Sequence, residues 1–98
     1  MKEKIEKIVK EVVTQFAIEN NIAKLKNPDL NTVLFGFDSV IDSIGLVTII
    51  VEVESNLYDE LGIQVSLADE KAMSQLNTPF KTVGSLTEYI AKIISNQP

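Results

Sequence analysis

Few side chains in this sequence could carry out chemistry on their own. The 98 residues include no histidine and no cysteine, and all nine basic residues are lysines. Without an imidazole or a thiol, the chain has no general base of the usual kind, no thiolate nucleophile, no disulfide and no ordinary structural zinc site. A Ser-His-Asp triad is therefore excluded. We expect neither a catalytic residue nor a metal ligand.

The most informative polar residue is Ser43, in the stretch Asp42-Ser43-Ile44-Gly45-Leu46-Val47. It stands where a helix is predicted to begin, and an N-cap role alone would explain a serine there. A nucleophilic role would need an activating lysine or carboxylate, but no lysine lies between Lys26 and Lys71 and no oxyanion-hole motif is recognisable. A small hydrolase is thus the weakest functional hypothesis.

Ser39, in the stretch Gly36-Phe37-Asp38-Ser39-Val40, is a rival position for the same role. A helix beginning there would place Gly45 further inside, where glycine costs about 1 kcal/mol relative to alanine. A start at Ser43 instead gives the core positions to larger residues, which are Ile49, Ile50, Val53 and Leu57. We therefore prefer Ser43.

Negative charge is concentrated around these serines. Residues 29–70 contain nine acids and no lysine, whereas the segments before and after them are each slightly basic, and the whole chain carries a net charge of −5. Such a field steers a basic partner toward the middle of the chain. With no arginine for bidentate phosphate contacts, we expect no nucleic acid partner. A solvated acidic face kept for solubility is the alternative explanation.

Two long amphipathic helices are predicted on either side of a connection. The first helix is predicted from apolar residues at helical spacing, which are Ile5, Ile8, Val9, Val12, Val13 and Phe16. Asn20 and Asn21 can end this helix. Pro28 disfavours helix at this point, and a long loop follows it. The loop is too apolar for a free linker, because it contains Leu30, Val33, Leu34, Phe35 and Phe37. We expect that loop to pack over the core.

The second helix is predicted over residues 43–61. Its run of β-branched residues would suit a strand by propensity, but Leu46, Ile49, Ile50, Val53, Leu57 and Leu61 follow a helical face and Gly62 suits a helix end. A short third helix is predicted from the capping pattern at residues 66–69 to a point before Pro79, and Thr82 can cap a last helix. The inner face of that last helix would carry Val83, Leu86, Tyr89, Ile90, Ile93 and Ile94.

These patterns predict an all-α fold, a four-helix bundle in which residues 1–98 form a single domain. No stretch has the composition of a signal peptide or the length of a membrane span, so we expect a cytoplasmic protein without membrane insertion.

The order of these elements resembles that of the acyl carrier protein family over nearly the whole chain. The most specific stretch is Asp42 to Val47, supported by Val53-Glu54, Leu57 and Gly62-Ile63, and later by Phe80-Lys81-Thr82-Val83 with Tyr89-Ile90. The resemblance implies a bundle with a long loop between its first two helices and a short third helix.

The resemblance further implies that a phosphopantetheinyl transferase, working with Mg²⁺, attaches 4′-phosphopantetheine from coenzyme A to Ser43. Asp42 matches an acid that helps to position the metal and the transferase. The cofactor would supply the thiol that this chain lacks, and partner enzymes would supply the catalysis. A phosphodiester at a helix start is also favoured, by about 0.3 to 1 kcal/mol, because of the free N–H groups and the helix dipole.

A second apolar line on the predicted second helix comprises Ile44, Val47 and Val51. It is either extra core or a partly exposed stripe, which family members use to dock partner enzymes. With Glu52 and Glu54 it would offer basic acyl-loading and acyl-processing enzymes both contact area and orientation.

Gly45 and Thr48 stand where housekeeping fatty-acid carriers commonly have acids, and the Gly-Gly-x-Ser form of peptide-synthetase carriers is absent. The first departure suggests a specialised carrier, and the second makes a fragment of a larger synthase less favoured than a free-standing carrier. We further expect a monomer that is not an enzyme. A helical adaptor without a prosthetic group remains the alternative.

Overall fold

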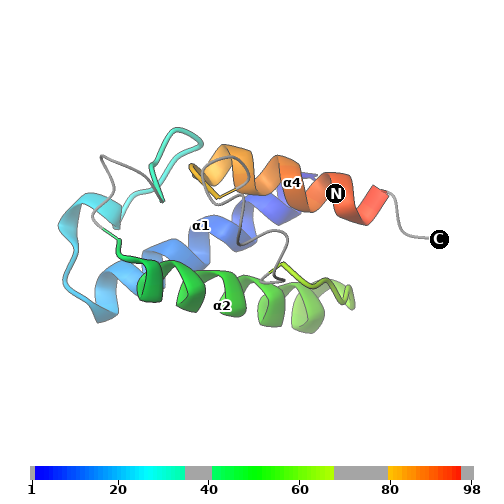
Figure 1. Ribbon diagram of the computed structural model, residues 1–98, viewed down its shortest axis with the longest axis horizontal. Coiled ribbons are helices and arrows are strands. Elements are labelled where there is room, and N and C mark those ends of the chain that lie inside the picture. Colours follow the sequence, from blue (N-terminus) through cyan, green and yellow to red (C-terminus); the bar gives the residue numbers. More distant parts are fainter. Residues whose placement is uncertain (1, 35–40, 68–79, 96–98) are drawn as a thin grey trace.

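The structure is a computed structural model that describes residues 2–34, 41–67 and 80–95 (Figure 1). It contains three α-helices, α1 (Lys2–Glu19), α2 (Ser43–Leu61) and α4 (Val83–Ser95), and a short 3₁₀ helix, η1 (Ala23–Leu25). The described segments contain no β-strand, which confirms the all-α class. The short helix expected between residues 66 and 79 falls almost wholly outside the described residues. A four-helix bundle thus stays a prediction, and what the described part shows is a three-helix arrangement.

Helix α1 buries the face that its sequence predicts. Five of the predicted core residues, Ile5, Ile8, Val9, Val12 and Val13, are buried, and Phe16 is partly buried. The helix ends where two asparagines follow it: the Asn20 N–H donates to the Phe16 carbonyl, and Asn21 adopts the left-handed conformation with a φ of 56°. Asparagine tolerates that conformation better than most residues.

The connection from η1 toward α2 is fastened to the start of α4. An isolated antiparallel bridge joins Val33 to Thr82, and the Leu34 N–H donates to the Lys81 carbonyl at 2.7 Å. Leu34 is fully buried and Val33 half-buried, as expected of a packed connection, although Leu30 is exposed. Phe35 and Phe37, which were expected to pack as well, lie outside the described residues.

Helix α2 has the predicted bounds, and burial rather than β-propensity decides its conformation. Its core face consists of fully buried side chains, which are Leu46, Ile49, Ile50, Val53 and Leu57. Gly62 follows with a φ of 66°, and its N–H donates to the Tyr58 carbonyl at 3.0 Å. Glycine reaches this left-handed conformation without the steric cost that a Cβ brings.

Helix α4 begins with the predicted cap. The Ser85 N–H donates to the Thr82 hydroxyl at 3.0 Å, and the Thr82 N–H donates in return to the Ser85 hydroxyl at 2.9 Å. The inner face buries Val83, Leu86 and Ile90, while Tyr89, Ile93 and Ile94 pack against the core with part of their surface exposed. The predicted inner face is thereby confirmed.

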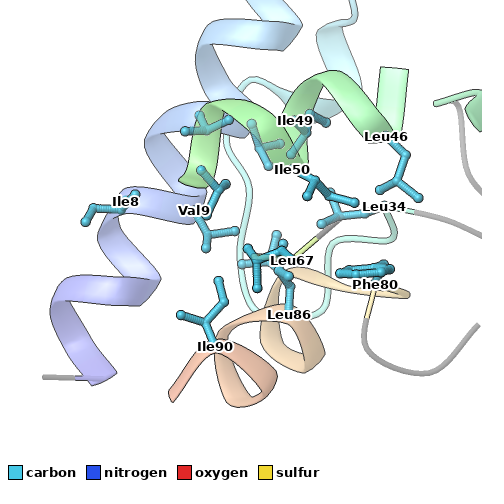
Figure 2. Close-up of a cluster of buried hydrophobic side chains, with 14 of the residues drawn as sticks. Ile8, Val9, Leu34, Leu46, Ile49, Ile50, Leu67, Phe80, Leu86 and Ile90 are labelled. Atoms are coloured by element: carbon cyan, nitrogen blue, oxygen red, sulfur yellow. The ribbon is translucent and has the colours of Figure 1, made fainter. Parts of the chain in front are cut away.

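Helix α1 packs against both α2 and α4 and joins them into one core. Figure 2 shows Leu34, Leu67 and Phe80 between α2 and α4, so side chains from the connections complete the core that the helices begin. The Phe80 ring meets the ring of Tyr89 edge to face, with centroids 5.9 Å apart. This core fixes α2 along one face and leaves its opposite face outward.

Candidate functional site

The start of α2 is capped by Asp42 and not, as the sequence suggested, by Ser43. Asp42 has an extended backbone, with φ −81° and ψ 177°, and its carboxylate accepts a hydrogen bond from the Gly45 N–H at 2.7 Å. Ser43 is the first residue of the helix itself. The prediction of Ser43 as the N-cap was wrong by one residue, because aspartate caps as well as serine does and its charge also suits the positive end of the helix.

This correction removes the ordinary structural explanation for a serine at position 43. Because Asp42 already makes the capping hydrogen bond, helix α2 does not require a hydroxyl at the next residue. The order of Asp42 and Ser43 therefore assigns the capping to the acid.

Two backbone N–H groups at this helix end have no acceptor within the helix. The Gly45 N–H is used by the Asp42 carboxylate and the Leu46 N–H by the Asp42 carbonyl, at 2.9 Å. The N–H groups of Ser43 and Ile44 precede them in the first turn, where no helical carbonyl lies ahead. N–H groups in the first turn of a helix are the kind of donors that suit a phosphate ester.

Gly45 allows the first turn of α2 to pack closely on the end of α1. A Cβ on Gly45 would lie 2.9 Å from the Phe16 Cζ atom and 2.9 Å from the Ile41 Cγ2 atom. These distances are too short for carbon atoms that are not bonded, so any side chain would push Phe16 or Ile41 aside. This contact favours glycine at position 45.

The second apolar line of α2 is exposed. The exposed fractions of Ile44, Val47 and Val51 are 77%, 36% and 51%, so the alternative that these residues form extra core is wrong. Tyr58 was not among the residues predicted to form this line. Its side chain is 60% exposed and lies two helical turns beyond Val51 on the same side. The spacing of seven residues between Val51 and Tyr58, which equals two helical turns, could have predicted this position from the sequence. We call Ile44, Val47, Val51 and Tyr58 the outer stripe.

Glu52 and Glu54 do not form one cluster with the outer stripe. Exposed Glu52 lines a hollow together with residues of α1, including Val12 and Gln15. Half-buried Glu54 instead lines a hollow with Tyr58 and with residues 64 and 65, beyond the end of α2. The two acids thus lie on opposite sides of the helix, and sequence proximity alone could not show this. Helix α2 carries four acids and no lysine.

Comparison with protein-family models, with curated proteins and with solved structures found no match. In the segments that the structure describes, no helix combines the length and the hydropathy that crossing a membrane requires.

Proposed function

We propose that this protein is a discrete acyl carrier whose 4′-phosphopantetheine arm is attached to Ser43. One observation carries the proposal: the helix that begins at Ser43 exposes an apolar stripe although its opposite face already fills the core. Exposed apolar surface next to a candidate attachment point is what a protein needs if successive enzymes must recognise it.

The proposed group fits the residues at this helix start. When bound, it supplies a thiol that holds acyl or related carboxylic intermediates as thioesters. Ser43 would form the phosphodiester, and the first-turn N–H groups of Ser43 and Ile44 would stabilise its negative charge. Asp42 would hold the first turn in place through its hydrogen bond to Gly45. In the same proposal, the Asp42 carboxylate contributes to binding the metal of the transferase.

The partners in this proposal are a phosphopantetheinyl transferase and enzymes that load and process the acyl group. The outer stripe would provide contact area, and the acids of α2, including Glu52 and Glu54, would attract basic docking surfaces. The chain itself would not be an enzyme, because it offers neither an imidazole nor a thiol of its own.

Intact-mass analysis tests the attachment. We expect that incubation with coenzyme A and a phosphopantetheinyl transferase of broad specificity adds one phosphopantetheine to the protein. In that transfer the Ser43 oxygen forms a bond to phosphorus, the pyrophosphate bond of coenzyme A breaks, and adenosine 3′,5′-bisphosphate leaves. Ser43→Ala should abolish the mass increment, whereas the matched control Ser39→Ala should retain it.

The same experiment decides between the carrier and its alternative, a helical adaptor. An adaptor would use the outer stripe to bind partner proteins and would need no group on Ser43. Absence of the increment from the unsubstituted protein, under conditions that modify a known carrier, favours the adaptor. Loss of the increment in Ser39→Ala alone would move the attachment point to the earlier serine.

A further inference from the structure

A groove runs between α1 and α2 on the side of α2 that bears Glu52. It consists of two hollows of about 310 and 530 Å³, and both are lined by Phe16, Glu19 and Thr48. The first hollow extends along the helices to Asn56, and the second reaches Asp42 at the start of α2. We call this continuous surface the α1–α2 groove.

The groove has an apolar floor and an acidic rim. Val12, Ile41 and Ile49 in its lining are buried, and Phe16 is half-buried. The described residues of the lining also include four acids and no lysine; the acids are Glu11, Glu19, Asp42 and Glu52.

The acids of the rim are not neutralised to the same degree. Glu11 lies 3.9 Å from the Lys7 ammonium group, in an exposed pair of little strength. Within the described segments, neither Glu19 nor Glu52 has a lysine within ion-pair distance. Among the described residues, Glu19 accepts a hydrogen bond only from the neutral amide of Gln15, at 3.1 Å. These two carboxylates therefore leave negative charge at the groove that this part of the chain does not balance.

We propose that the α1–α2 groove binds a cationic amphipathic segment of a partner protein. Lysine and arginine side chains combine an aliphatic stem, which suits the floor around Phe16, with a charged head, which suits Glu19 and Glu52. A second copy of this chain fits poorly, because the net charge of −5 and the acidic rims would repel each other. The groove lies on the opposite side of α2 from Glu54, so it is a surface separate from the one that Glu54 and Tyr58 share.

This inference concerns the surface of the unmodified protein and does not require a group on Ser43. Its test is a titration of the isotope-labelled full chain with a synthetic amphipathic peptide of lysine and leucine, followed by NMR. We expect the largest shifts at the groove amides of Gln15, Thr48 and Asn56, and weaker binding as salt is raised. Ile44 borders both surfaces, because it belongs to the outer stripe and also lines the second hollow. Shifts confined to Val47, Val51 and Tyr58, or absence of binding, would overturn the proposal.

Charge-matched variants separate the groove from general attraction to an acidic protein. Removal of the two unbalanced charges, in Glu19→Gln with Glu52→Gln, should weaken peptide binding roughly fivefold, as expected for exposed charge pairs. The control Glu3→Gln with Glu88→Gln removes the same charge from positions that line neither hollow and should change binding less than twofold. Equal losses in both double variants would contradict the proposed site.

A second pair of variants tests the shape of the groove. Thr48→Lys places a lysine of the chain itself in the groove and should reduce peptide binding at least as much as the loss of two acids does. Ser55→Lys makes the same charge change on the same helix, two turns further on and outside both hollows, and should have the smaller effect. If the two lysine variants bind the peptide equally well, the groove is not its site.

Discussion

At the scale of single residues, the start of α2 divides two tasks between neighbours. Asp42 closes the helix end with a hydrogen bond of 2.7 Å to Gly45, and Ser43 begins the helix. This division makes the structural contribution of Asp42 separable from its proposed contribution to phosphopantetheine transfer. The cap needs an oxygen acceptor, whereas binding of a metal by the transferase complex would need the negative charge.

We therefore predict that Asp42→Ala lowers the free energy of unfolding by about 0.5 to 2 kcal/mol, because the cap is lost. Asp42→Asn should retain most of the stability, since asparagine caps nearly as well. Urea denaturation monitored by circular dichroism measures both. Equal destabilisation by the two substitutions would show that the cap is not the main contribution of Asp42 to the fold.

Gly45 provides a second prediction at this scale. Alanine is the better helix former, but its Cβ would stand 2.9 Å from Phe16, and overpacking of this kind costs about 1 to 3 kcal/mol. We expect Gly45→Ala to be destabilising in spite of the gain in helix propensity. In a Phe16→Leu background, which shortens the opposing side chain, the same substitution should cost less. A double-mutant cycle of unfolding free energies measures this coupling, and strict additivity would contradict the contact.

At the scale of elements, α2 has two apolar faces with different surroundings. Ile50 and Ile44 illustrate the difference, because Ile50 is fully buried whereas Ile44 is 77% exposed. The core face stabilises the fold, and the outer stripe contributes little to it. An exposed apolar side chain that does not stabilise the fold remains available for contact with another protein.

The same substitution on both faces tests this distinction. Ile50→Ala should lower the free energy of unfolding by about 2 to 5 kcal/mol, because it leaves a cavity in the core. Ile44→Ala should change it by about 0.5 kcal/mol or less, as is usual at exposed positions. Urea denaturation of the two variants measures the difference. Similar losses would mean that Ile44 packs in the folded protein and is not part of an exposed stripe.

At the scale of the whole molecule, helical periodicity predicted the faces that form the core. Burial repeats with the helix, so Leu46, Ile49 and Val53 could be assigned to one face from spacing alone, against their β-propensity. The ends of α1 and α2 were also predictable, because Asn21 and Gly62 occupy left-handed backbone conformations that few other residues favour.

The features that the sequence did not reveal depend on contacts between elements. Nothing in the spacing of Gly45 indicates that Phe16 occupies the space beside it. Likewise, Glu52 and Glu54 are two residues apart in sequence, yet one faces α1 and the other the segment after α2. Periodicity predicts which face of a helix is buried, but it does not predict which other element packs beside that face. The α1–α2 groove forms where α1 and α2 pack side by side, so it could not be predicted from the spacing of residues.

The bridge between Val33 and Thr82 has a consequence for how the chain folds. The two residues are separated in sequence by the whole of α2, so closing the bridge fixes a long loop and costs chain entropy that local helix formation does not. The hydrogen bonds from Leu34 and Val83 at this bridge can form only once the two distant segments have met. We expect this junction to be among the last parts to form during refolding, and pulsed hydrogen exchange at the Leu34 and Val83 amides measures when it forms.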